Sequence, residues 1–276
     1  MTDRTILITG AAGQVGTALR HELRNDFRLR LADFQPVRDL TNREEAVRCD
    51  VTVASEIAAA MQGVDGVIHL AGWPVEGSWE QVIGPNLIGN INTFEAARLA
   101  GVRRMVYAST NHAVGFYPRS STIDHRVMLR PDSRYGATKA FGELLAAQYW
   151  DKHGISSLCI RIGNCNLDNR PLDKRRLSIW VSWRDLAQLA RIGLEHPEIS
   201  FNVVYGISGN KRAWYDNSEA FRLGYNPQDD SERYAAEILA REPAADPDDV
   251  GERMMGGSFC ALDYEGDPKR PERVRT

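Results

Sequence analysis

A glycine-rich turn directly after the first apolar run limits the folds open to this chain. Residues 5–10 form a β-rich run, and the turn that follows carries Gly10, Gly13 and Gly16 ahead of an amphipathic stretch at 14–25. Glycines are needed in such a turn because a side chain would keep a phosphate away from the free N–H groups at the helix start. The strand–turn–helix context therefore predicts a nucleotide-binding unit.

Apolar β-rich runs alternate with longer helical patterns through the first 163 residues. The expected strands lie at 5–10, 27–33, 46–51, 66–72, 104–110 and 157–163. The expected helices lie at 14–25, 55–63, 86–101 and 135–152. This repetition predicts an α/β fold, a Rossmann-like doubly wound parallel sheet with helices on both faces.

The regular alternation ends after residue 163. We therefore expect a nucleotide-binding domain over 1–163 and a small C-terminal substrate-binding cap over 164–265, packed on the same domain. The elements expected in the cap are helices at 184–195, 215–222 and 231–241 and a strand at 201–206. The charged segment 266–276 is expected to be a disordered tail.

Composition argues against several classes of protein. The 276 residues carry a formal net charge of -3, whereas nucleic-acid binders are strongly basic. No apolar run approaches the roughly 18 residues of a membrane span, and the N-terminus enters a strand without room for a signal peptide. The four cysteines lack the spacing of a disulfide framework or a metal site. These features predict a cytoplasmic protein without metal, nucleic-acid or membrane partners.

Acidic residues follow the second and third strands. Asp33 lies 17 residues after Gly16, where a carboxylate can accept hydrogen bonds from both adenosine ribose hydroxyls and repel a 2′-phosphate. NAD is therefore favoured over NADP, with Arg38 as a counter-argument and a strand-end cap as the alternative role for Asp33. Asp50 could contact the adenine amino group or cap a helix. The cofactor would then pass the backbone of Leu70, Ala71 and Gly72.

A tyrosine and a lysine in the expected helix at 135–152 suggest proton transfer. Tyr135 and Lys139 are four residues apart, so they share one helix face. A nearby ammonium group favours the phenolate and lowers the pKa of a tyrosine. Thr110, which ends the fifth strand 25 residues earlier, could hydrogen-bond the reacting hydroxyl. Ser109 is the rival for this role, and Thr110 is preferred because neighbouring strand residues point to opposite faces.

Together these motifs resemble the extended short-chain dehydrogenases. The glycine turn, Asp33, Asp50-Val51, HLAG, Asn86, YAST and Tyr135-x-x-x-Lys139 occur in that family's order over roughly residues 4–241. The resemblance implies hydride transfer to NAD, with Tyr135 as the base and Lys139 holding the nicotinamide ribose. It places further cofactor contacts at Gln14, Val15, Val51, Asn86, Ser109 and Ile162.

Other segments resemble the uronate dehydrogenases, namely ASTNHAVGFYP, RPDSRYGATKAFGE, RIGNC, RRLSIW, WYDNS and GGSF. Those bacterial enzymes oxidise C1 of glucuronate or galacturonate with NAD and form the aldarolactone. The resemblance implies that Arg175 grips the substrate carboxylate, as a planar guanidinium can. A solvated basic loop is the alternative, since Arg170, Lys174 and Arg176 are close by. The other substrate residues implied are Asn111, His112, Pro74, Asn164 and Phe259.

Two positions depart from the uronate dehydrogenase pattern. Trp73-Pro74 replaces a smaller residue and a serine, and Pro74 cannot hydrogen-bond a substrate through its side chain or its nitrogen. Asn164 also stands where serine is expected. These changes leave hydride transfer intact and could alter the sugar preference.

Other functions remain open at this point. A dehydrogenase or epimerase acting on another sugar or a sugar nucleotide would not need a carboxylate fork at Arg175. A non-catalytic NAD-binding sensor would usually have lost the tyrosine–lysine pair. The resemblance also implies a homo-oligomer, assembled through the helices at 86–101 and 135–152.

Overall fold

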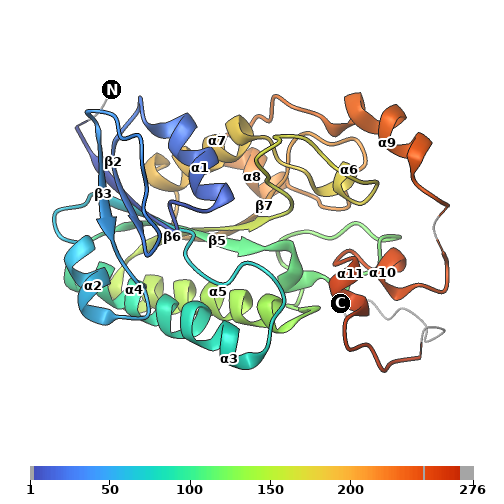
Figure 1. Cartoon of the computed structure of the whole chain (residues 1–276), viewed down its shortest axis with the longest axis horizontal. Helices are drawn as coiled ribbons and strands as arrows, with labels where there is room; N and C mark the ends of the chain where they lie inside the picture. Colours follow the sequence, from blue (N-terminus) through green and yellow to red (C-terminus); the bar gives the residue numbers. More distant parts are fainter. Residues whose placement is uncertain (1–2, 245, 268–276) are drawn as a thin grey trace.

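The fold is built on one seven-stranded parallel sheet in the order β3-β2-β1-β4-β5-β6-β7 (Figure 1). The computed structural model describes residues 3–244 and 246–267. The strands are β1 (Thr5–Thr9), β2 (Arg28–Asp33), β3 (Glu44–Arg48), β4 (Gly66–His69), β5 (Arg104–Thr110), β6 (Ser156–Ile162) and β7 (Phe201–Gly206).

Helices connect the strands and cover both faces of the sheet. The α-helices of the first part of the chain are α1 (Gln14–Leu23), α2 (Ala54–Ala60), α3 (Trp79–Val82), α4 (Gly89–Leu99) and α5 (Arg134–His153). Those that follow are α6 (Arg176–Ile179), α7 (Trp183–Glu195), α8 (Ser218–Arg222), α9 (Ala235–Arg241), α10 (Val250–Arg253) and α11 (Ser258–Ala261). A π-helix, η1 (Ile83–Ile88), precedes α4, and the 3-10 helices are η2 (Asn111–Val114) and η3 (Ser231–Tyr234).

Strand alternation divides the core into two layers. Ile6 and Ile8 of β1 pack into the cluster that contains the apolar faces of α1 and α7. Leu7, which lies between them, packs into the opposite cluster with α2, α4 and α5. Figure 1 shows α1 and α7 above the sheet and α4 and α5 below it. The expected doubly wound α/β fold is confirmed.

Three elements differ from the sequence expectation. The strand expected inside the cap at 201–206 is β7, which pairs in parallel with β6, so the main sheet continues beyond residue 163. The third strand lies earlier than 46–51 because the backbone of β2 pairs with the polar segment Glu44–Arg48 at the sheet edge. The helix expected at 86–101 starts within the π-helix η1 (Ile83–Ile88) and becomes α-helical only from Gly89, and such a π-helical distortion is often found near functional sites.

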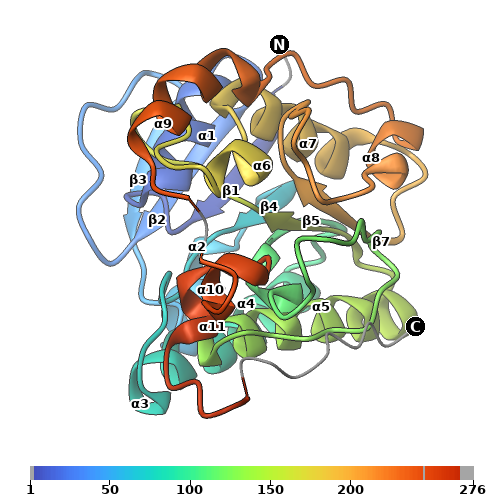
Figure 2. The same ribbon diagram turned by 90° about the vertical axis from the view of Figure 1, so that its right-hand side faces the viewer.

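The last described segment folds back over the carboxyl ends of the strands. Met255 N–H donates to Tyr117 O at 2.9 Å, and Gly256 N–H donates to Gly115 O at 2.9 Å. The Arg119 side chain donates to the carbonyls of Gly251 and Met254. Figure 2 shows α10 and α11 below α6 and to the left of α5.

The sequence also predicts a disordered tail at 266–276 and no membrane-spanning helix. Most of the expected tail, 268–276, lies outside the described residues. Within the parts that are described, the helices are too short or too polar to cross a bilayer.

Candidate active site

The glycine turn leaves space only for backbone at the start of α1. Gly10 has a φ of 72°, and a Cβ there would lie 2.7 Å from Ala71 N. A Cβ on Gly16 would lie 2.5 Å from Gly10 O. Helix α1 starts after Gly13 without a side-chain cap and without an acid in its first turn, so its N–H groups remain open to an anion. The turn therefore fits a pyrophosphate.

Asp33 and Asp50 follow neighbouring strands and have different surroundings. Asp33 accepts hydrogen bonds from Ala12 N–H and Gln35 N–H, each at 2.9 Å, so its carboxylate is attached directly to the glycine turn. The position suits the adenosine ribose of a nucleotide bound on that turn. Asp50 Oδ1 accepts from both the N–H and the hydroxyl of Thr52, in a turn that precedes α2.

Asn86 fixes the chain where β4 ends. Its Oδ1 accepts from Trp73 N–H at 2.6 Å, and its Nδ2 donates to Trp73 O at 3.2 Å and to Thr138 Oγ1 at 2.9 Å. The side chain thus ties the backbone after Leu70-Ala71-Gly72 to α5. Its amide hydrogens are committed to the protein, and a direct contact of Asn86 with NAD stays a prediction.

Tyr135 and Lys139 lie one turn apart at the start of α5. Ser133 caps the helix by accepting from Gly136 N–H at 3.0 Å, and Glu76 accepts from Tyr135 N–H at 3.0 Å. Burial raises the pKa of Tyr135 to about 12, an effect opposed by its hydrogen bond with Thr110. Burial lowers the pKa of Lys139 to about 8.

The hydroxyls of Thr110 and Ser109 point to different groups. Ser109 Oγ donates to Glu143 Oε1 at 2.5 Å, on the buried side of α5. Thr110 lies with Tyr135 and accepts from His112 N–H at 3.2 Å. This placement favours Thr110 as the hydroxyl beside the reacting atoms. The same placement gives Ser109 a structural partner, Glu143. The contact of Ser109 with the cofactor remains a prediction.

His112 is held between aromatic rings near Tyr135. It stacks on Phe259 with ring centroids 4.2 Å apart, and it meets Tyr135 edge-on at 6.0 Å. Its Nδ1 lies 2.7 Å from Asp132 Oδ2. Burial lowers the pKa of His112, and the contact with Asp132 opposes that shift. The structure thus brings the expected residues His112 and Phe259 to Tyr135.

Arg175 reaches the same region from the loop before α6. Its Nε donates to Met255 O at 2.8 Å. With the Asn111 amide oriented to satisfy both of its ends, Arg175 Nη2 donates to Asn111 Oδ1 at 2.9 Å and Asn111 Nδ2 donates to Ile162 O at 3.2 Å. Ile162 therefore contributes to this network only through its backbone carbonyl, which holds the Asn111 amide.

The Arg175 side chain is partly buried, and although Asp132 and Asp173 favour its charge, no described carboxylate lies within ion-pair distance of it. Burial lowers its pKa, and it forms no ion pair with any residue in 3–244 or 246–267. Its neighbours Arg170 and Arg176 each pair with a nearby carboxylate. Arg175 thus differs from a solvated basic loop, and a partly buried cation without an ion pair gains most when a ligand supplies an anion.

The two positions that depart from the expected pattern lie at the edges of this region. Pro74 is exposed in the loop between β4 and α3. Asn164 follows β6, and its Oδ1 accepts from Asn166 Nδ2 at 2.9 Å. Among the described residues Asn164 Nδ2 has no acceptor, so it can donate to a ligand.

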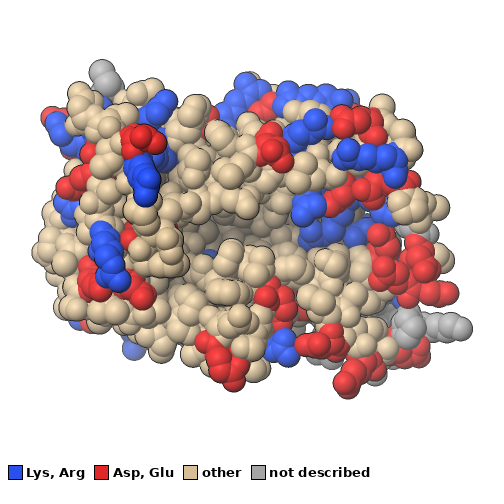
Figure 3. Space-filling view, viewed as in Figure 1, with Lys and Arg blue, Asp and Glu red and all other residues tan. Residues whose placement is uncertain are grey.

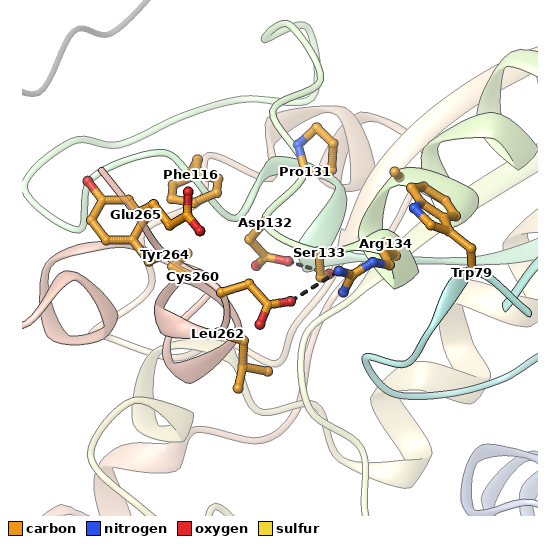
Figure 4. Close-up of a pocket in the computed structure, with 12 residues that line it drawn as sticks. Trp79, Phe116, Pro131, Asp132, Ser133, Arg134, Cys260, Leu262, Tyr264 and Glu265 are labelled. Atoms are coloured by element: carbon orange, nitrogen blue, oxygen red, sulfur yellow. Dashed lines mark hydrogen bonds and ion pairs between the residues drawn. The ribbon is translucent and has the colours of Figure 1, made fainter. Parts of the chain in front are cut away.

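A hollow of about 350 Å³ lies beside the site (Figure 4). It shares Asp132 with the site but does not include Tyr135, Lys139 or Arg175. In Figure 3 the face of the molecule toward the reader is also hollowed near its centre, and the walls of this central hollow are mainly uncharged. The hollow beside the site is lined by Trp79 of α3, by Phe116 after η2, by the start of α5 and by the end of the described chain.

Comparison with known proteins identifies the family. The model of the NAD dependent epimerase/dehydratase family matches residues 6–183. A uronate dehydrogenase of Pseudomonas putida is 40% identical over 92% of this chain and 95% of its own. The chain belongs to this family, among the uronate dehydrogenases.

Solved structures agree with this assignment. A glucuronic acid dehydrogenase of Chromohalobacter salexigens superposes with a TM-score of 0.91 at 40% identity, covering 98% of this chain and 100% of that one. A variant of the Agrobacterium tumefaciens uronate dehydrogenase, solved in complex with NAD, has a TM-score of 0.90 at 39% identity, covering 94% and 98%. NAD is the cofactor of this family member.

The uronate dehydrogenase site contains residues that the sequence analysis missed. Glu76 accepts from the Tyr135 N–H, and Asp132 contacts His112. Tyr215 is 5% exposed and interacts electrostatically with Arg175. Asp132 and Tyr215 both lie in segments that resemble the family, but only the folded chain shows their contacts.

Metal chemistry has no obvious site in the described structure. Within residues 3–244 and 246–267, no three His, Cys, Asp or Glu side chains come together in a way that could hold a metal ion. All four cysteines are free and buried.

Proposed function

We propose that this chain oxidises a uronic acid, glucuronate or galacturonate, at C1 with NAD and releases the aldarolactone. The observation that carries the proposal is the partly buried guanidinium of Arg175, which lies beside Asn111 and forms no ion pair with a described residue. A sugar carboxylate would provide the anion that this cation lacks, through a charge-assisted hydrogen bond. The chain's place among the uronate dehydrogenases supports the same substrate class.

The protein's part in the chemistry is to place and deprotonate the C1 hydroxyl. Tyr135 would take that proton, and Thr110 would hold the same oxygen through its hydroxyl. Lys139, whose pKa of about 8 leaves it mainly protonated at pH 7, would stabilise the phenolate and hold the nicotinamide ribose. NAD, when bound, supplies the acceptor for the hydride that leaves C1.

The cofactor would be held by groups of the first half of the chain. The N–H groups after Gly13 suit its pyrophosphate, and Asp33 suits its adenosine ribose. Asn111, His112 and Phe259 would contact the sugar, and Asn164 Nδ2 would replace the hydroxyl of the serine expected there. Pro74 offers no hydrogen bond, so the preference among uronates can differ from that of the relatives.

A substrate panel tests the proposal. NADH formation from NAD would be followed with glucuronate, galacturonate, their neutral parent sugars and UDP-sugars. Oxidation of the uronates, with kcat/KM values at least about a hundredfold above those of the neutral sugars, is expected because one charged pair is lost in the neutral sugars. Equal oxidation of neutral sugars would remove the role given to Arg175.

We also propose that the enzyme self-associates and works in the cytoplasm. Ile88 at the end of η1, Ile91 on α4 and Leu144 on α5 are exposed apolar residues on neighbouring elements. Buried, free cysteines suit a reducing compartment. Light scattering should give a multiple of the 30.9 kDa chain mass, and Leu144→Glu should reduce it to one chain. A monomeric wild type would contradict self-association.

A further inference from the structure

The Asp132 carboxylate is buried directly against the Nδ1 edge of His112. Asp132 Oδ2 and His112 Nδ1 are 2.7 Å apart, and the Asp132 side chain has no exposed surface. The backbones are joined as well, since Asp132 N–H donates to His112 O at 3.2 Å. A buried carboxylate needs such partners because desolvation without them is costly.

The surroundings of Asp132 fix the position of its carboxylate. Ser133 Oγ donates to Asp132 Oδ1 at 2.7 Å. Gly115 and Gly256 approach so closely that a Cβ on either would come within 1.8 Å of Asp132 Oδ2. These two glycines are joined by the Gly256 N–H to Gly115 O hydrogen bond, which closes the C-terminal segment over the carboxylate. A side chain on either glycine would therefore displace the carboxylate.

The second nitrogen of the His112 ring, Nε2, is not committed to any described residue. Stacking on Phe259 at 4.2 Å fixes the ring plane, and the ring meets Tyr135 at 6.0 Å. Among the described residues His112 Nε2 has no hydrogen-bond partner. The ring therefore has one nitrogen committed to Asp132 and one available beside the catalytic tyrosine.

We propose that Asp132 is a positioning residue that sets the tautomer of His112. The carboxylate accepts the Nδ1 proton, so that Nε2 is unprotonated and accepts a hydrogen bond from a hydroxyl of the sugar. The inference rests on the proposed function, because it requires a sugar in this site.

The charges around His112 agree with a neutral ring. Asp132 and Glu76 favour the imidazolium, whereas burial, the largest influence, and Arg175 disfavour it and leave the pKa of His112 lowered. A neutral ring with Nδ1 protonated is an acceptor at Nε2, whereas the imidazolium would be a donor there. The sugar hydroxyl is thereby oriented with its proton toward His112.

Nitrogen NMR of the wild-type protein tests the tautomer directly. In protein labelled with ¹⁵N-histidine, the His112 signals should show a protonated Nδ1 and an unprotonated Nε2 at pH 7. The signals are assigned by their loss in His112→Gln, one of the six histidines of the chain. A protonated Nε2 in the wild type would overturn the proposal, and this measurement does not depend on an Asp132 variant that folds.

Kinetics of Asp132→Asn test the role in the reaction. The amide is close in size to the carboxylate, but its NH₂ group would donate to Nδ1 and reverse the tautomer. We expect kcat/KM for the uronate to fall at least about tenfold, as when a histidine is held in the wrong tautomer, with NAD affinity unchanged. Asp185→Asn is the matched control, because Asp185 is another buried carboxylate with hydrogen-bond donors of its own, lies on α7 and has no contact with His112 among the described residues.

A double-variant cycle separates a role through His112 from a general structural role. If Asp132 acts through His112, Asp132→Asn/His112→Gln should be no slower than His112→Gln alone. Losses that multiply, or wild-type kinetics in Asp132→Asn, would refute the proposal. A wild-type enzyme that does not oxidise uronates would instead refute the proposed function, so the two failures can be told apart.

Discussion

Glu143 and Arg161 form a two-point ion pair inside the protein, one turn along α5 from Lys139. Arg161 Nε and Nη2 lie 2.9 Å from Glu143 Oε1 and Oε2, and both side chains are less than 5% exposed, at 3% and 4%. Ser109 donates to the same carboxylate, and Arg161 also donates to the Tyr205 hydroxyl. The pair joins the helix that carries Tyr135 to β6.

Breaking this pair should be far more costly than replacing it. Glu143→Leu would leave the Arg161 charge buried and unpaired, which should lower the free energy of unfolding by about 3–5 kcal/mol. Glu143→Leu/Arg161→Met should recover part of that loss. Urea unfolding measures both, with Arg126→Ala as the control, since that residue forms an exposed pair with Asp124 and should cost less than about 1 kcal/mol. A double variant less stable than Glu143→Leu would contradict the argument.

Removing the Tyr135 hydroxyl should stop the chemical step. Tyr135→Phe keeps the ring contacts with His112 and Phe259 but removes the base, so kcat should fall by about 10²–10⁴. NAD affinity, measured by calorimetry, should stay unchanged. Tyr149→Phe on the same helix is the control, because its hydroxyl bonds Glu95 away from the site. Turnover near the wild-type level in Tyr135→Phe would exclude it as the base.

Thr110 and Ser109 should affect different properties. Thr110→Val removes the hydroxyl beside Tyr135 and should lower kcat by about 10-fold or more, as loss of one hydrogen bond to the reacting group does. Thr110→Ser should restore the rate. Ser109→Ala removes a buried hydrogen bond to Glu143 and should reduce stability by about 1 kcal/mol with little change in kcat. The reverse pattern would assign the catalytic hydroxyl to Ser109.

Asp33 should set the preference for NAD. Asp33→Asn keeps an acceptor for the Ala12 N–H but removes the charge that repels a 2′-phosphate, so the NAD-to-NADP ratio of kcat/KM should fall by about tenfold or more. Steady-state kinetics with each cofactor measure this ratio. Asp39→Asn, an exposed acid in the loop after β2, is the control for the loss of one charge. An unchanged ratio in Asp33→Asn would show that other groups select the cofactor.

Most of the sheet could be predicted because buried parallel strands have continuous apolar runs. The run at 66–69 in β4 and the glycine turn at Gly10 are local signals that required no tertiary information. β3 was misplaced because Glu44–Arg48 is mostly exposed and is a strand only through its pairing with β2. β7 looked like part of a cap because its membership in the sheet depends on a contact with β6.

The sequence reveals the tyrosine–lysine pair that we propose to be catalytic, whereas it does not reveal the groups that support this pair. Tyr135 and Lys139 share a helix face, which spacing alone reveals. Asp132 meets His112 only because the loop before α5 returns to the end of β5, and Glu76 reaches Tyr135 across 59 residues of chain. Contacts of this kind depend on the tertiary fold, and no periodicity predicts them.

Burial of the Lys139 ammonium should make the stability of the protein depend on pH. The fall of its pKa from 10.5 to about 8 corresponds to about 3 kcal/mol of destabilisation at pH 7, because the folded state disfavours the charge. Between about pH 8 and 10.5 the folded state loses this proton before the unfolded state, so the penalty fades as pH rises. Lys139→Met should therefore unfold at higher urea concentration than the wild type at pH 7.

The size of that gain is reduced by one lost contact. Lys139 Nζ lies 5.3 Å from the centroid of the Tyr107 ring, and such a contact contributes about 1 kcal/mol. We expect Lys139→Met to be more stable by about 2 kcal/mol at pH 7, with the gain gone near pH 10.5. Lys152→Met, at an exposed position on the same helix, should change stability by less than about 0.5 kcal/mol at pH 7. A Lys139→Met variant that is less stable than the wild type at pH 7, by an amount that does not vary with pH, would show that burial of the charge has no such cost.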